Sequence, residues 1–176
     1  VCPSCTTKRM AATAAHLVDS VIPRVPMRQW VLSLPKRLRP ALRNHAALAT
    51  RVLRIFISSI QRELRRSAAA PVGARIGAVS FLQRFGSALN EHWHYHCCVS
   101  DGVFAAADGQ TLAFMPATID VADIVARVQA RVRGRVLALY CRHGVLSAED
   151  AQNMAGWDHG GGFSVDASVG IAADDR

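Results

Sequence analysis

Apolar residues recur with two different periods along this chain, and these periods predict its helices and strands. Apolar residues recur at helical spacing over residues 8–22, 40–66 and 121–143, which predicts three helices. Short β-prone or alternating runs predict strands at residues 29–34, 77–85, 92–98, 103–104, 111–114 and 163–169. This order predicts an α+β fold with a central antiparallel sheet and packed helices.

The run His92-Trp93-His94-Tyr95-His96 is the most informative of the predicted strands. Residues two apart in a strand point to the same face, so His94 and His96 can present two neutral imidazoles to one metal ion. Trp93 and Tyr95 then point to the opposite face, where we expect the core. The alternative is that the histidines serve packing or hydrogen bonding only.

A neighbouring strand could complete such a site. If the predicted strand at 77–85 pairs antiparallel with the histidine strand, Gln83 approaches the histidine face, because cross-strand neighbours lie roughly 5 Å apart between Cβ atoms. This pairing would bring Gln83 within reach of the imidazoles.

Positive charge is concentrated in one segment. The chain has a net charge of +8, and the segment 36–66 contains nine Lys or Arg against one acidic residue, Glu63. The predicted helix at 40–66 carries arginines on its polar face, namely Arg43, Arg51, Arg54, Arg62, Arg65 and Arg66. Such a face suits contact with the phosphates of DNA; the alternative is a solvated helix face that happens to use arginine.

The five cysteines do not form a disulfide framework. Their odd number and the lack of a secretory signal favour a reducing compartment, and no apolar run is long enough to span a membrane, so we expect a cytoplasmic protein. Cys2 and Cys5 have the spacing of half a tetrahedral zinc site. No second ligand pair at suitable spacing follows them.

Metal and polyanion signals in one domain point to phosphodiester chemistry. The segment from Gly77 through His94-Tyr95-His96 to Phe104 resembles the core of bacterial insertion-sequence transposases of the rolling-circle, two-tyrosine type. These belong to the single-strand endonucleases with a histidine-hydrophobic-histidine motif. Cys2 to Cys5 and residues 28–35 are similar to the zinc-binding segment of that family and to the entry of its catalytic domain.

The resemblance implies a fold, a site and a reaction. The metal pair falls on His94 and His96, in the middle strand of an antiparallel sheet. The resemblance also implies a third, polar ligand from a neighbouring strand, for which we choose Gln83. The bound ion, Mg²⁺ or Mn²⁺, would activate a phosphate of single-stranded DNA for attack by a tyrosine. That tyrosine lies downstream of the matching region in the family, and Tyr140 sits in an apolar helical context that favours core packing. We therefore interpret the chain as a truncated copy lacking its nucleophile.

The resulting expectation is a remnant of a zinc-binding segment at residues 1–22 and a partial catalytic domain at 23–176, with its histidine core at 77–104. The predicted function is metal-dependent nicking and strand transfer at single-stranded element ends during DNA transposition. One alternative is a DNA-binding module without catalysis, in which the histidines are structural. The others are a replication initiator or relaxase of the same endonuclease group, and an unrelated metallohydrolase.

Overall fold

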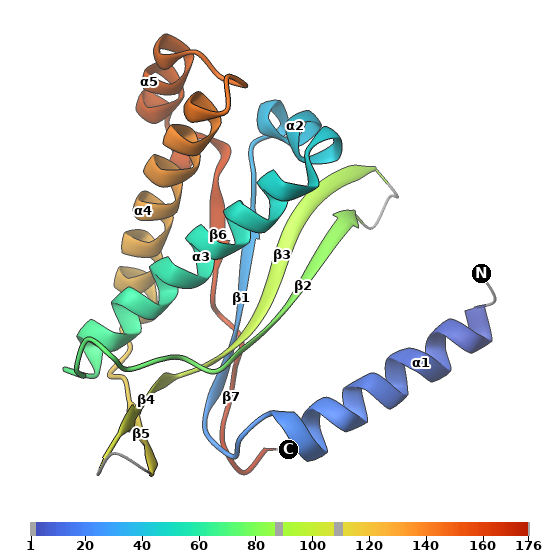
Figure 1. Ribbon diagram of the computed structural model, residues 1–176, viewed down its shortest axis with the longest axis vertical. Helices are drawn as coiled ribbons and strands as arrows, with labels where there is room; N and C mark the ends of the chain where they lie inside the picture. Colours follow the sequence, from blue (N-terminus) through green and yellow to red (C-terminus); the bar gives the residue numbers. More distant parts are fainter. Residues whose placement is uncertain (1–2, 87–89, 108–110, 176) are drawn as a thin grey trace.

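The computed structural model describes residues 3–86, 90–107 and 111–175 (Figure 1). Its helices are α1 (Pro3–His16), α2 (Arg39–Asn44), α3 (Ala46–Ser67), α4 (Val121–Arg142) and α5 (Ala148–Gly156), with short helical turns at Leu17–Val21, Lys36–Leu38 and His159–Gly162. Its strands are β1 (Met27–Ser33), β2 (Ala78–Phe85), β3 (Glu91–Ser100), β4 (Gly102–Ala106), β5 (Leu112–Pro116), β6 (Ser164–Asp166) and β7 (Gly170–Ile171).

A five-stranded antiparallel sheet forms the centre of the described structure. The strand order is β2-β3-β1-β6, and β7 pairs with the other end of β1. β4 and β5 form a separate hairpin. The α+β architecture with an antiparallel sheet is as predicted, and β3 is an inner strand of that sheet.

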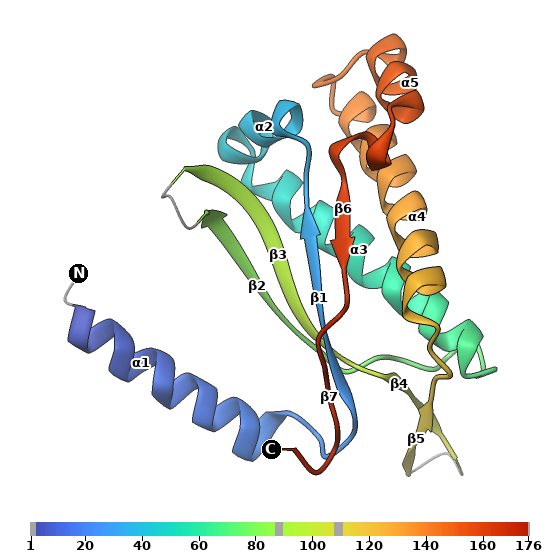
Figure 2. The same cartoon turned by 180° about the vertical axis from the view of Figure 1, so that it is seen from behind.

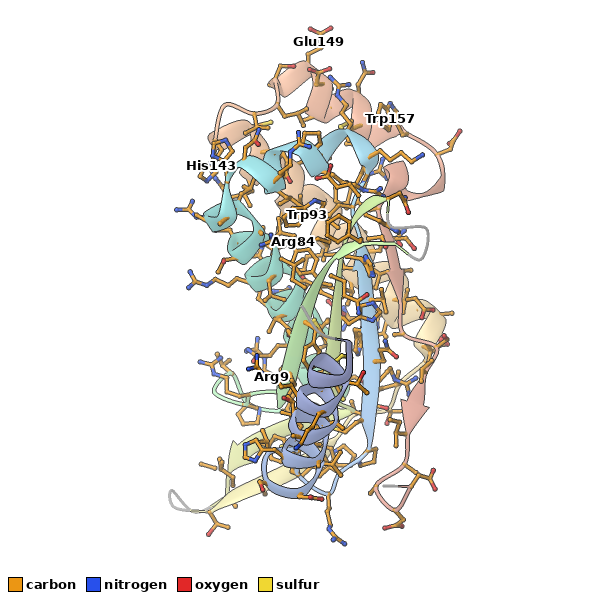
Figure 3. All side chains as sticks on the ribbon, turned by 90° about the vertical axis from the view of Figure 1, so that its right-hand side faces the viewer. Arg9, Arg84, Trp93, His143, Glu149 and Trp157 are labelled. Atoms are coloured by element: carbon orange, nitrogen blue, oxygen red, sulfur yellow. The ribbon has the colours of Figure 1, made fainter. Side chains whose placement is uncertain are left out.

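The two long helices α3 and α4 cover one face of the sheet, as Figures 1 and 2 show from opposite sides. Helix α1 lies on the other side and extends away from the strands; in Figure 3 it stands in front of the sheet. From residue 7 to the end of α1, every residue is exposed. The sheet thus has one covered face and one open face.

The core lies between the sheet and the helices α3 and α4. Its largest fully buried side chains are aromatic residues contributed by strands and helices alike: Trp30, Phe56, Tyr95, Tyr140 and Phe163. Helix α3 buries one stripe of residues at helical spacing and leaves its other side to solvent. The hydrophobic pattern, more than intrinsic propensity, therefore fixes how α3 lies on the sheet.

The helix predicted at 40–66 is wrong as one continuous element. The structure divides it into α2 and α3 at His45, whose backbone angles of φ −135° and ψ 86° lie outside the helical region. Asn44 and His45 are both weak helix formers, so a bend here costs little. The bend lets α3 follow its own direction across the sheet.

Side chains cap the first turns of α4 and α5. The Asp120 carboxylate accepts a hydrogen bond from the Asp123 backbone N–H at 3.2 Å, and the Ser147 hydroxyl accepts one from the Asp150 N–H at 3.0 Å. These bonds satisfy backbone donors that have no partner within the helix.

We expect Phe56→Ala to lower the free energy of unfolding by about 3–5 kcal/mol, because Phe56 is fully buried where α3 meets the sheet. Chemical denaturation measures this change. The control is Arg54→Ala on the exposed side of the same helix, for which we expect a change within about 0.5 kcal/mol. Equal effects of the two substitutions would contradict the packing described here.

Candidate functional site

The alternation of β3 places its histidines on the open face of the sheet. Trp93, Tyr95 and Cys97 are buried on the covered face, whereas the histidines between them are half-buried. The ring centroids of His92 and His94 are 4.9 Å apart, and those of His94 and His96 are 5.0 Å apart. The imidazoles thus form a row along one strand.

The neighbouring strands supply the side chains that flank this row. In the sheet register, His94 pairs with Gln83 of β2 and with Ser33 of β1. His96 pairs with Phe81 of β2 and with Val31 of β1. Cross-strand partners share a face, so the structure brings Gln83 beside the histidines.

Both ring nitrogens of His94 have a polar neighbour. Its Nδ1 lies 2.6 Å from the backbone carbonyl oxygen of His92, which can only accept a hydrogen bond. Nδ1 therefore carries a proton, and in the neutral ring Nε2 keeps a lone pair that points outward. The Oε1 atom of Gln83 lies 2.9 Å from that Nε2. In this arrangement two electron-rich atoms face each other.

Gln29 is a neighbour of the histidines that the sequence analysis missed. Its Nε2 lies 2.7 Å from the Nδ1 atom of His96. The signal was present, because Gln29 is a polar residue in a predicted strand. Its place could not be assigned without the pairing of β1 with β3, which sets Gln29 opposite Cys98 and diagonal to His96.

The surroundings of His92 and His96 favour the neutral imidazole. Burial lowers the pKa of His92 below its usual value, and the positive charge of Arg39 together with the nearby His94 lowers it further. Burial also lowers the pKa of His96, with a smaller contribution from His94. Neutral imidazole is the form that binds a metal ion.

Among the residues that the structure describes, no group of three or more His, Cys, Asp and Glu side chains could hold a metal ion. A metal at the histidines would therefore take two imidazoles and complete its shell with neutral oxygen ligands or substrate. The side-chain oxygen of Gln83 suits such a neutral ligand, since it already contacts His94.

Neither tyrosine of the sequence reaches the histidine face. The Tyr95 hydroxyl donates to the Ala49 carbonyl and the Tyr140 hydroxyl to the Leu38 carbonyl, both at 3.1 Å, and both side chains are buried on the helical side of the sheet. Burial raises the pKa of each hydroxyl well above its usual value of about 10. The expectation that Tyr95 points away from the histidines and that Tyr140 packs in the core agrees with this geometry.

The arginines predicted to bind DNA lie on α2 and α3, which belong to the covered side of the sheet. Two of them have acidic partners, because Arg43 is 3.3 Å from Glu91 and Arg66 is 4.0 Å from Glu63. Arg51 contacts the His143 ring at 2.9 Å, and Arg65 donates to the Val72 carbonyl. Arg43 thus lies at the start of the histidine strand, whereas Arg51, Arg65 and Arg66 of α3 meet partners on the helical side.

The cysteine pair predicted to bind zinc is described only in part. Cys2 lies outside the described residues, and Cys5 belongs to helix α1. Zinc binding by Cys2 and Cys5 therefore stays a prediction from the sequence. Within the described part of the chain, no helix has the length and apolar character needed to cross a membrane.

Residues 77–176 match the model of a family of putative transposases, which is more than half of the chain. The chain belongs to this family of putative transposases. No curated protein and no solved structure matched the chain. The family match begins just before β2 and includes the histidine strand β3 and helix α4, whereas β1 and α3 precede it. The resemblance to transposases noted from the sequence is therefore confirmed at the level of the family.

The buried tyrosines of this family member predict an alkaline transition. As the pH rises above about 10, tyrosines ionise in the unfolded chain but not in the fold, so the unfolded state gains stability and the protein loses it. Below that pH both states hold neutral tyrosine and no such loss occurs. We expect tyrosinate absorbance to appear together with the loss of helical circular dichroism.

The control for this titration is the pair of single variants Tyr95→Phe and Tyr140→Phe, each of which removes one of the two tyrosines of the sequence. Each should roughly halve the tyrosinate signal. Reversible ionisation of both tyrosines near pH 10 with the fold intact would contradict their burial.

Proposed function

We propose that this member of the transposase family binds single-stranded DNA at the open histidine face and uses a divalent metal ion there for nicking and strand transfer. The observation that carries the proposal is the pair of acceptors His94 Nε2 and Gln83 Oε1, 2.9 Å apart. Two lone pairs at this separation repel each other unless a positive group lies against both.

The spacing of these atoms fits two ligands of one ion. Octahedral ligands of Mg²⁺ lie at about 2.0–2.1 Å from the ion, so two of them at a right angle are about 2.9 Å apart. The proton on His94 Nδ1, bound by the His92 carbonyl, fixes the tautomer that ligation needs. A turned Gln83 amide would explain the same distance by a hydrogen bond, so a metal titration is required.

His96 can join this site once its neighbour Gln29 adapts. The 2.7 Å contact has the Gln29 amide nitrogen facing His96 Nδ1, which places the imidazole proton on Nε2. Turning the Gln29 amide by 180° makes its oxygen accept from Nδ1–H and frees Nε2 as a ligand. Gln29 would then orient His96 as the His92 carbonyl orients His94.

The open face also offers a surface for an unpaired base. Phe81 pairs with His96 across the strands, and its side chain is 48% exposed. Phe85 lies beyond a bulge in β2, pairs with Glu91 and borders a hollow with Arg43 and Trp93, so Phe81 is the exposed ring beside the histidines. Aromatic side chains of this kind stack with unpaired bases without reading their sequence. This favours single-stranded DNA as the ligand of the face.

The proposed division of roles follows from these contacts. A bound Mg²⁺ or Mn²⁺ would polarise the scissile phosphate and offset the charge of the transition state. His94, His96 and Gln83 would hold the ion, and Phe81 would position the adjacent base. Tyr95 and Tyr140 take no part, because their hydroxyls bond to carbonyls on the other side of the sheet. The nucleophile would thus be supplied by another group.

The burial of both tyrosines also favours a second candidate, a DNA-binding module without catalysis. In that case the histidines are structural and DNA binding needs no metal. Its affinity would fall with salt by about 0.7 log units per single-strand phosphate contact for each log unit of salt, and chelation of metal would leave it unchanged.

A manganese titration tests the proposed metal pair. We expect the protein to bind one Mn²⁺ at the histidine face, and the double variant His94→Ala, His96→Ala to lose this binding by at least tenfold. His92→Ala is the matched control on the same strand and face, and its Mn²⁺ affinity should stay within about twofold. Equal uptake by the double variant and the unmodified protein would overturn the assignment.

Substitutions of Gln83 test the third ligand. We expect Gln83→Ala to weaken Mn²⁺ binding by roughly tenfold, in line with the usual effect of removing a supporting ligand. Gln83→Glu should strengthen it, because a carboxylate adds a negative charge at the same reach. If both variants bind Mn²⁺ like the unmodified protein, Gln83 only hydrogen-bonds to His94.

A further inference from the structure

A groove rich in arginine lies between α3 and α4, on the side of the molecule away from the histidines. It has a volume of about 240 Å³. Helix α3 contributes Ser58, Gln61, Arg62 and Arg65, and helix α4 contributes Arg131 and Arg135. The two helices lie side by side in Figures 1 and 2. Four guanidinium groups thus border one hollow.

No acidic side chain neutralises these arginines within the described residues. Glu63 and Asp123 are the carboxylates close by on the two helices, and both are paired with Arg127, with a distance of 2.8 Å to Glu63. Arg131 and Arg135 follow Arg127 at intervals of four residues on α4 but form no ion pair there. Arg127 is thus paired with carboxylates, whereas Arg131, about one turn further along α4, has no acidic partner.

The polar atoms of the groove are only partly satisfied. Arg135 donates to the Ser58 hydroxyl at 2.6 Å, which joins the two helices across the groove. The Nε atom of Arg131 is buried and has no hydrogen-bond partner. Burial, with the charges of Arg131 and Arg142, lowers the pKa of Arg135. An anion in the groove would relieve both the repulsion and the missing bond.

The positive surface continues along the same pair of helices. At the other end of the seam, Arg51 of α3 contacts His143 just after α4, next to Arg142. From Arg51 to Arg65 the helix rises about 21 Å at 1.5 Å per residue. This length suits a row of several phosphates better than a single phosphate ion.

We propose that the seam between α3 and α4 binds the sugar-phosphate backbone of a DNA segment other than the one at the histidine face. The sheet lies between the two surfaces, so one short strand cannot contact both. The proposal shares with the proposed function only the choice of DNA as partner. DNA binding at the seam requires no metal ion and no cleavage of the DNA strand.

DNA fits this seam better than an acidic polypeptide does. Arginine forks bind phosphate oxygens through two parallel hydrogen bonds, and a nucleic-acid strand repeats such oxygens at regular spacing. Membership of a transposase family makes DNA the expected polyanion. The groove is also open along its length, since Arg62 and Arg135 are both exposed.

The test compares two charge-matched double variants. Arg62→Gln with Arg135→Gln changes one exposed residue on each side of the groove. The control, Lys8→Gln with Arg9→Gln, removes the same charge from exposed positions of α1, where Figure 3 labels Arg9. Binding of a fluorescent oligonucleotide is measured in chelator over a range of salt concentrations, and circular dichroism monitors folding.

We expect the groove variant to bind roughly tenfold more weakly and to lower the salt slope by about 1.4 to 1.8, for two lost phosphate contacts. The α1 variant should keep both values nearly unchanged. Equal losses in the two variants would show that only net charge matters and would overturn the proposal. Equally tight, groove-dependent binding of polyglutamate would overturn the choice of DNA.

The histidine variants separate this proposal from the proposed function. His94→Ala with His96→Ala should keep the metal-free binding that depends on Arg62 and Arg135. Loss of that binding would mean that the two surfaces form one site, contrary to the proposal. A failed manganese titration, by contrast, would leave the groove result untouched.

Discussion

The structure depends on the two-residue alternation of β3 between its neighbours β1 and β2. Trp93, Tyr95 and Cys97 fill the core on one face, and this places the intervening histidines on the other. A shift of pairing by one residue would bury the imidazoles and expose the tryptophan and tyrosine. Packing of the core thus sets the position of the candidate metal site. The histidine row needs no interaction of its own to stay on the open face.

The same sheet divides the molecule into two chemically different surfaces. The open face has imidazoles, amides and the exposed ring of Phe81, whereas the helical side has arginines that lack acidic partners along the α3 and α4 seam. A metal ion and an unpaired base suit the first surface, and repeated phosphates suit the second. The arginines of α3, noted from the sequence, therefore lie on the side of the sheet opposite the histidines.

The sequence allowed predictions wherever a local pattern decides the structure. The alternation of residues 92–96 predicted which face holds the histidines, and the apolar spacing over 121–143 predicted helix α4. The bend at His45 was not predicted, because apolar spacing continues across it and only packing on the sheet reveals it. Gln29 and the arginine groove depend on which strands and helices become neighbours, and periodicity within one element holds no information about that.

The two tyrosines limit what this fold can do alone. Both hydroxyls are bonded within the core, on the opposite side of the sheet from His94 and His96. In the proposed function, this member of the transposase family would bind a metal ion and DNA while another group attacks the phosphate. The central claim of this proposal is that His94, His96 and Gln83 form one metal site.

A crystal structure grown with Mn²⁺, measured at a wavelength where manganese scatters anomalously, tests this claim most directly. The account predicts one strong anomalous peak within bonding distance of the imidazoles of His94 and His96 and of the Gln83 side-chain oxygen. Manganese bound elsewhere, with Gln83 Nε2 turned to donate to His94 and no peak beside the histidines, would contradict it.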